Sequence, residues 1–254
     1  MSKKNILVTN DDGIYAPGIK ALWEAMSELG HVTVVAPNRE QSAVGHAITL
    51  SDPLRVDEIN RSNGFKGFSV DGTPSDCVKI ATQALLEVEP NVIVSGINLG
   101  SNTGTNIIYS GTVSAATEGT MLKIPSVAVS LNSFESRDFA GAKKAAKTVV
   151  SHVLEKGLPE KTLLNVNVPA IPENELKGYK ITQQGNVAFR DSFEKRVDPK
   201  GRVYYWMTGQ MFDPDEEPNM DHNAVMDNFV SISPIHYRLT NHDFLDELKS
   251  WDLS

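Results

Sequence analysis

The sequence predicts an α/β protein with a doubly wound core. Two observations lead to this prediction. Short, almost continuously apolar runs alternate with helical patterns through the first two thirds of the chain, and several of the apolar runs end in loops rich in Asn, Asp, Gly or Ser. Buried parallel strands joined by crossover helices produce this rhythm, because helices on both faces leave the strands apolar on both sides. We therefore expect a mostly parallel sheet between two helical layers.

The elements of the core follow one another in a regular order. The first helix has apolar residues at helical spacing, with Pro17 suited to its first turn and Gly30 to its C-cap. A later helix should begin at Thr73-Pro74-Ser75-Asp76, which is typical of a helix start. The pattern predicts strands at 5–9, 31–36, 54–59, 65–70, 91–95, 126–131 and 163–168, and helices at 17–29, from 73 onward, 112–122 and 139–154.

The pattern changes after Pro172. Residues 179–184 and 202–208 alternate like the two strands of a β-hairpin around a charged loop. Residues 210–228 carry six acidic residues and no Lys or Arg, so an exposed or partner-contacting arm is expected there. A strand at 230–233 and a helix at 243–251 should close the chain. We expect a core at 1–172 and a hairpin, arm and closing strand and helix at 173–254, integrated into one domain.

Composition excludes several classes of protein. The chain has 254 residues, of which 40% are hydrophobic and 22% charged, as in ordinary globular proteins. Its net charge of -8, without a basic stripe, argues against binding nucleic-acid polymers. No apolar run has the roughly 20 residues that cross a bilayer, and the N-terminus does not have the core of a signal peptide. The single cysteine, Cys77, fits a reducing compartment. We expect a cytoplasmic protein that does not interact with membranes.

Polar residues follow three of the predicted strands. Asp11 and Asp12 follow the first strand, Ser42 lies in the loop after the second, and Asn98 follows the strand at 91–95. Ligands of open α/β sheets bind at the carboxyl ends of strands, so neighbouring strands would bring these oxygens together. Adjacent carboxylates repel unless a cation lies between them, and Mg²⁺ or Mn²⁺ accepts such ligands. Alternatively, Asp11-Asp12-Gly13 forms only a turn.

A possible phosphate site begins at Tyr109. The segment from Ser110 to Ala116 is typical of a loop that enters a helix of small residues, where free backbone N–H groups bind phosphate. Simple N-capping by Ser110 or Thr112 explains the same residues equally well. The loop after Asn98 does not have the spacing of a P-loop or a dinucleotide-binding motif. His46 lies in the Ser42 loop and could approach the site, and Cys77 fits a small buried helix residue better than a nucleophile.

Taken together, these motifs resemble the SurE family of survival proteins, which act as metal-dependent 5'-nucleotidases. The resemblance covers nearly the whole chain. It departs from the family pattern mainly in the tail, where Met220-Asp221 and Asn228-Phe229 replace a usual Thr-Asp and Gly-Tyr, and also at Thr117 and Lys123. The matching segments are Ile6–Gly18, Val35–Ser42, Gly72–Val78, Ser95–Asn102, Tyr109–Ala116 and Asp198–Trp206.

The resemblance implies a Rossmann-like core and a C-terminal part that forms homodimers or homotetramers by exchanging arms. It also implies one divalent ion per subunit, held by Asp11, Asp12, Ser42 and Asn98. The implied activity is hydrolysis of nucleoside 5'-monophosphates, extending to 3'-monophosphates and short polyphosphate. The departures in the tail affect the expected arm geometry and substrate preference, but not the metal site.

The predicted mechanism is attack of a metal-activated water on phosphorus. Asp11 or Asp12 would take the proton of the water, and the phosphate would be bound by Asn102, Ser110, Gly111 and Thr112. A competing hypothesis uses Asp11 as a nucleophile that forms an aspartyl-phosphate, but such enzymes favour an Asp-x-Asp spacing. A third hypothesis is a regulator that binds nucleotide and metal without catalysis.

Overall fold

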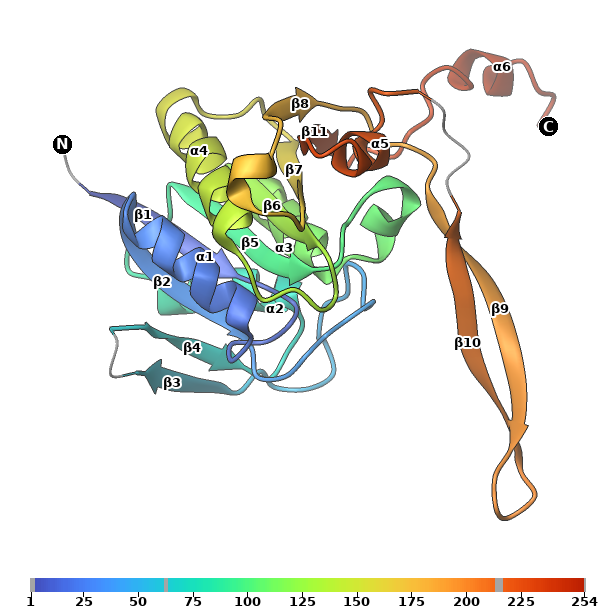
Figure 1. Ribbon diagram of the computed structural model, residues 1–254, viewed down its shortest axis with the longest axis horizontal. Helices are drawn as coiled ribbons and strands as arrows, with labels where there is room; N and C mark the ends of the chain where they lie inside the picture. The colour runs from blue at the N-terminus through green and yellow to red at the C-terminus, as the bar shows by residue number, and fades with distance from the viewer. Residues whose placement is uncertain (1–2, 62–63, 213–216, 254) are drawn as a thin grey trace.

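The computed structural model describes residues 3–61, 64–212 and 217–253. Nine strands form one mostly parallel sheet in the order β3-β4-β2-β1-β5-β6-β7-β11-β8 (Figure 1). This confirms the predicted α/β class. The strands of the sheet are β1 (Lys4–Thr9), β2 (Gly30–Pro37), β3 (Val56–Asn60), β4 (Lys66–Val70), β5 (Val92–Leu99), β6 (Ser126–Asn132), β7 (Thr162–Pro169), β8 (Tyr179–Ile181) and β11 (Val230–His236).

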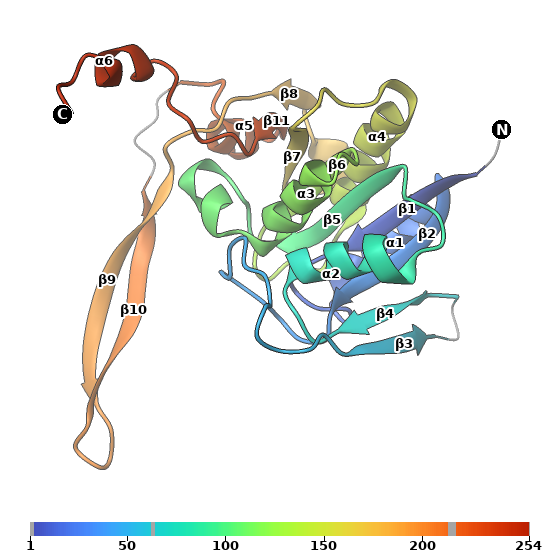
Figure 2. The same cartoon turned by 180° about the vertical axis from the view of Figure 1, so that it is seen from behind.

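Helices cover both faces of the sheet. Helices α1 (Pro17–Ser27) and α4 (Ala140–Lys156) lie on one face, and α2 (Pro74–Ile80) and α3 (Gly111–Met121) lie on the other (Figures 1 and 2). The start of α2 is as predicted, since Thr73 and Asp76 form a reciprocal capping box. A π-helical turn (Ala81–Leu85), two 3-10 helices (Gly104–Tyr109 and Glu173–Glu175) and the short helices α5 (Asp221–Met226) and α6 (Leu245–Lys249) complete the helical elements of the described residues.

The core consists of apolar layers on the two sides of the sheet. One layer joins the strands to α1 and α4 through buried side chains such as Leu22, Met26 and Val150. On the other side, Cys77 and Val78 of α2 pack against Leu7 and Ile93. Burial of this kind contributes about 25 cal/mol per Å² of apolar surface. The layers hold the strands rigidly, so the loops at the strand ends are supported by a fixed frame.

The predicted hairpin partners were wrong. The strand expected at 179–184 shortens to β8, which pairs in parallel with β11 inside the main sheet. The hairpin is formed by β9 (Ala188–Val197) and β10 (Val203–Phe212), which pair with each other over their whole length. Alternation indicates a strand but does not identify its partner. In addition, β9 is exposed along almost its whole length, so its charged sequence does not show the alternation of a half-buried strand.

The projecting arm is this hairpin rather than the acidic segment. Figure 1 shows β9 and β10 extending away from the body of the molecule. Within the acidic segment, residues 213–216 lie outside the described residues, and Asp221 is fully buried. The Asp221 carboxylate accepts hydrogen bonds from the backbone N–H groups of Gly104 at 2.9 Å and Gly185 at 3.1 Å. A buried carboxylate with such partners anchors the tail to the loop after β5.

The C-terminal part is joined to the same sheet as the core. Strand β11 pairs with β7, and β8 pairs with β11. The proposed boundary at residue 172 stays a prediction. In the described parts of the chain, no helix is long and apolar enough to cross a membrane.

Candidate active site

Three neighbouring parallel strands bring the predicted oxygen ligands to one edge. Strand β1 lies between β2 and β5, as the prediction of a shared edge required. Asp11, Ser42 and Asn98, from the loops after β1 and β2 and from the end of β5, line one hollow of about 440 Å³. Asn102 and Ser110 line the same hollow. We call it the strand-end hollow, and its size falls in the usual range for ligand pockets.

The turn after β1 is joined to the loop after β2. The side-chain amide of Asn10 donates to the carbonyl oxygen of Gly13 at 3.1 Å and closes the turn. Gly13 has φ +95°, and a Cβ there would lie 3.2 Å from the backbone of Arg39, so a side chain would be strained. The N–H of Gln41 donates to the carbonyl oxygen of Asp11 at 2.8 Å. The chain therefore bends at Asp11 and Asp12, the hydrogen-bonded turn follows at Ile14 and Tyr15, and the contact with Gln41 holds Asp11 beside the Ser42 loop.

Asp11 is buried against the start of α3. Its Oδ1 accepts a hydrogen bond from the hydroxyl of Thr112. Gly111 permits this approach, because a Cβ at that position would lie 2.7 Å from the Cβ of Asp11. Burial raises the pKa of Asp11, although the hydrogen bonds from Thr112 act in the opposite direction. The carboxylate is thus held in one orientation but poorly solvated.

Asp12 is the second carboxyl group of the site whose pKa is raised. Burial, then the charge of Asp11 and then that of Glu40, raises its pKa to about 7. A hydrogen bond from the backbone of Leu99 partly offsets this increase and links Asp12 to the end of β5. Two crowded carboxylates with raised pKa values indicate a site that a cation would stabilise.

In metal-free buffer, Asp12→Asn is expected to be more stable than the unchanged protein at pH 8. A carboxyl group whose pKa is higher in the folded state makes the folded state bind more protons. Its contribution is therefore present below the unfolded pKa of 3.8 and is lost as the pH rises through about 7. The gain in free energy of unfolding should be on the order of 2–4 kcal/mol at pH 8 and should shrink toward pH 4. Urea unfolding with chelator at both pH values measures it, and an equal gain at both would contradict it.

Asn98 and Ser42 are the two predicted ligands with neutral oxygens. Strand β5 is longer than predicted and includes Asn98, with a shift in its pairing to β6 between Gly96 and Asn98. The Asn98 side-chain amide donates to the carbonyl oxygen of Gly100 at 2.7 Å, which commits its nitrogen and orients its oxygen as the available ligand atom. The Ser42 hydroxyl donates to Glu40 at 2.5 Å.

The donor set fits a hard divalent cation. All four predicted ligands present oxygen, which suits Mg²⁺ or Mn²⁺. Over residues 3–61, 64–212 and 217–253, no three His, Cys, Asp or Glu side chains are grouped to hold a metal, so such a site depends on the hydroxyl and the amide. Buried oxygens of Thr9, Asn10 and Ser95 at the same strand ends make no hydrogen bond within these ranges. This edge is therefore polar beyond the four ligands themselves.

The four predicted phosphate-binding residues are divided between two positions. Ser110 lines the hollow and caps α3, because its hydroxyl oxygen accepts from the N–H of Val113 at 3.1 Å. Gly111 and Thr112 lie against the Asp11 carboxylate. Asn102 also lines the hollow. Its side-chain amide donates to Ser130 at 2.8 Å, and its backbone carbonyl oxygen accepts from the side-chain amides of Asn165 and Asn167. Ser110 can therefore cap α3 and still face a phosphate in the hollow.

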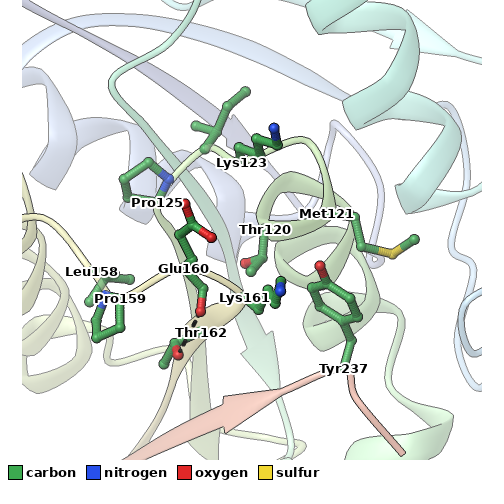
Figure 3. Close-up of a pocket in the computed structure, with 11 residues that line it drawn as sticks. Thr120, Met121, Lys123, Pro125, Leu158, Pro159, Glu160, Lys161, Thr162 and Tyr237 are labelled. Carbon is green, nitrogen blue, oxygen red and sulfur yellow. Dashed lines mark hydrogen bonds between the residues drawn. The ribbon is translucent and has the colours of Figure 1, made fainter.

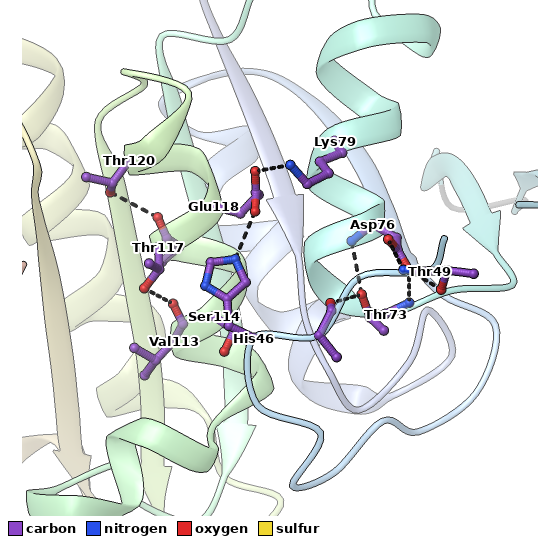
Figure 4. A network of polar contacts seen from close by, with 12 residues as sticks. His46, Thr49, Thr73, Asp76, Lys79, Val113, Ser114, Thr117, Glu118 and Thr120 are labelled. Atoms are coloured by element: carbon purple, nitrogen blue, oxygen red, sulfur yellow. Dashed lines mark hydrogen bonds and ion pairs between the residues drawn. The ribbon is translucent and has the colours of Figure 1, made fainter. Parts of the chain in front are cut away.

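An ion-pair cluster around the buried carboxylate of Glu118 ties the loop that carries Ser42 to α2 and α3 (Figure 4). His46 was expected to approach the site, but its Nε2 lies 2.8 Å from Glu118 of α3. Lys79 of α2 lies 2.7 Å from the same carboxylate. Burial alone would raise the pKa of Glu118, but the hydrogen bonds and charges of His46 and Lys79 lower it overall. The loop is also held at Ala47, whose carbonyl oxygen accepts from Thr73 at 2.7 Å.

Cys77 does not behave as a nucleophile. It is fully buried in α2, and burial raises its pKa well above the ordinary value. The interpretation as a small buried residue is confirmed, and the lowered thiol pKa that a helix start would give is absent at this residue.

A second hollow lies at the amino ends of β6 and β7 (Figure 3). Its lining comes from the end of α3, the segments before β6 and β7, and Tyr237 after β11. Lys123, Glu160 and Lys161 are its charged residues. Because ligands of open α/β sheets bind at the carboxyl ends of strands, the strand-end hollow is the better candidate.

Several residues of the strand-end hollow did not emerge from the sequence. Phe134 follows β6, so the strand-end rule could have found it. Phe189, Met211 and His222 come from the hairpin and the tail, and only their three-dimensional placement brings them to the hollow. Of these, His222 Nδ1 lies 3.5 Å from the hydroxyl of Thr103.

Comparison with known proteins shows which family the chain resembles. The family model described as survival protein SurE matches residues 6–191. A protein of Syntrophobacter fumaroxidans named 5'-nucleotidase SurE is 47% identical, with 98% of this chain and 99% of that protein covered. The protein of the same name from Pelotomaculum thermopropionicum is 49% identical, with 96% and 93% covered. The crystal structure of the SurE protein from Aquifex aeolicus superposes with a TM-score of 0.85 at 42% identity, covering 96% of this chain and 98% of that one.

Proposed function

Because this chain belongs to the SurE family, we propose that it is a divalent-metal-dependent 5'-nucleotidase, which releases phosphate from nucleoside 5'-monophosphates by attack of water on phosphorus. The observation that carries the proposal is the meeting of Asp11, Ser42 and Asn98 with Ser110, at the start of α3, in one hollow. Relatives named 5'-nucleotidase SurE, similar over nearly their whole length, support the same activity.

Asp11, Asp12, Ser42 and Asn98 would hold the cation. When bound, a Mg²⁺ or Mn²⁺ ion supplies Lewis acidity toward a phosphoryl oxygen and toward water. The cation would also offset the burial and the repulsion from Asp11 that together raise the pKa of Asp12.

The other roles follow from contacts of the chain itself. The backbone N–H groups in the first turn of α3 and the Ser110 hydroxyl would bind the phosphate, assisted by the helix dipole. Thr112 holds Oδ1 of Asp11, whereas Asp12 is less buried. We therefore assign Asp12 as the residue that accepts the proton of the attacking water, and Asp11 as the ligand that keeps its position.

Removal of the metal is expected to abolish phosphate release. The measurement is release from nucleoside 5'-monophosphates, 3'-monophosphates and short polyphosphate, with Mg²⁺, with Mn²⁺ and with chelator. Chelator should reduce turnover of the 5'-monophosphates to background, and added metal should restore it. We expect the metal-dependent activity to extend to 3'-monophosphates and short polyphosphate. Binding of nucleotide without turnover under every metal would instead identify a regulator.

We also propose that two or four copies assemble through the projecting hairpin. Its exposed side chains include Phe193, Tyr205, Trp206 and Met207, and large apolar groups on a surface often mark a contact with another chain. Location in the cytoplasm stays a prediction.

A further inference from the structure

The strand-end hollow is lined by two chemically different groups of residues. One group carries the oxygens described above. The other group consists of large apolar or aromatic side chains, Tyr109, Phe134, Phe189 and Met211, whose exposed fractions are 64%, 80%, 42% and 48%. We call these four residues, three aromatic and one methionine, the aromatic rim. Exposed aromatic side chains beside an anion site require an explanation, because large apolar groups on a surface often mark a contact.

Phe134 is exposed but held in place. Its ring packs on Gly100, where an added Cβ would lie 2.4 Å from the ring atom Cε1. The N–H of Gly100 donates to the carbonyl oxygens of Leu131 at 2.9 Å and Ser133 at 3.0 Å. The loop that carries Phe134 is therefore joined to the loop that follows Asn98. One part of the ring covers Gly100, and the rest is open to the hollow.

The rest of the aromatic rim is tied to the phosphate side of the hollow. Tyr109 directly precedes Ser110, and its carbonyl oxygen accepts from the N–H of Gly45 in the Ser42 loop at 3.1 Å. The side-chain amide of Asn106 lies 3.8 Å from the sulfur of Met211. These contacts join Tyr109 to the Ser42 loop and Met211 to the segment that precedes Ser110.

We propose that the aromatic rim is the nucleobase platform of the substrate site, with Phe134 as the stacking residue and Tyr109 as a second aromatic residue that lines the same hollow. This inference rests on the proposed function. A nucleoside monophosphate has a charged end and a flat aromatic end, which match the two kinds of residue that line the hollow. Stacking on an aromatic ring strengthens binding of any base, because every base has a π-face. The rim therefore selects phosphomonoesters that carry an aromatic group over those that do not.

The test compares Phe134→Ala on two substrates, adenosine 5'-monophosphate and ribose 5-phosphate. The variant is expected to lower kcat/KM for the nucleotide by about 10- to 100-fold, mainly through KM, and to leave ribose 5-phosphate nearly unchanged. Phe134→Trp should retain the nucleotide activity. The control is Trp251→Ala, which removes an aromatic side chain of 52% exposure outside the hollow and should change neither substrate.

The outcomes separate this inference from the proposed function. If the unchanged protein hydrolyses neither substrate with Mg²⁺ or Mn²⁺, the proposed function fails. If it hydrolyses both and Phe134→Ala lowers both equally, the platform is refuted. Sedimentation analysis is run in parallel, and a change of oligomeric state with equal loss on both substrates would show that Phe134 contacts a second copy instead.

Discussion

Asp11→Asn is expected to reduce phosphate release from a nucleoside 5'-monophosphate on the order of 10³-fold while the protein stays folded. The substitution removes a charge at the predicted cation site, where several kcal/mol of transition-state stabilisation originate. The shape is preserved, because an amide oxygen can still accept the Thr112 hydroxyl and fits beside Gly111. The measurements are steady-state kinetics and calorimetric titration with Mn²⁺, which should show weakened binding.

The matched control for this prediction is Asp57→Asn, an exposed carboxylate on β3 that lies outside the strand-end hollow. It should keep full activity and full Mn²⁺ affinity. Asp11 would be removed from the mechanism if its Asn variant retained normal turnover. Loss of turnover together with a collapsed circular dichroism spectrum would show misfolding, and Asp11→Ser would then be compared for metal binding.

Glu118→Ala is expected to lower the free energy of unfolding by about 2–4 kcal/mol. The substitution leaves His46 and Lys79 without their shared carboxylate, and breaking a buried ion pair costs several kcal/mol. The expected loss is smaller than for a fully buried ion pair, because the Lys79 side chain is 42% exposed and regains hydration. Since the Ser42 loop is attached through His46, the affinity for Mn²⁺ should fall as well. Urea unfolding and metal titration measure the two effects.

Glu24→Ala is the control, because Glu24 pairs with Lys143 at the surface with 39% exposure. Its cost should stay below about 1 kcal/mol. The pKa of Glu118 is lowered, so its contribution is present above the ordinary value of 4.5 and is lost as the pH falls through the folded pKa. A Glu118→Ala variant as stable as the unchanged protein at pH 7 would show that the cluster contributes nothing.

The candidate ligands could be predicted because strand ends are readable in a sequence. Apolar runs locate β1, β2 and β5, and parallel pairing then brings Asp11, Ser42 and Asn98 to one edge. The contact between Glu118 and His46 could not be predicted from their separation in the sequence, because it depends on how α3 packs beside the Ser42 loop. Phe189 and Met211 of the aromatic rim were missed for the same reason, because they reach the hollow from the hairpin, whereas Phe134 follows β6 and could have been found from the strand ends.

The C-terminal part was harder to predict because pairing there does not follow chain order. A short strand such as β8 leaves little pattern, and its partner β11 comes only after the whole hairpin. The hairpin itself is exposed along most of both strands, so burial imposes no alternation on it. The fold class is nevertheless confirmed, because the alternating pattern of strands and helices extends over most of the chain.

The position of β11 between β7 and β8 has a consequence for biosynthesis. As the chain leaves the ribosome, β7 emerges with an open outer edge, and β8 emerges before β11, the strand with which it pairs. Both strands must wait until residues 230–236, which follow the whole hairpin in the sequence, have been made. An open strand edge is a template for pairing with other chains. Nascent chains that stall within the hairpin should therefore aggregate more readily than chains that stall beyond β11.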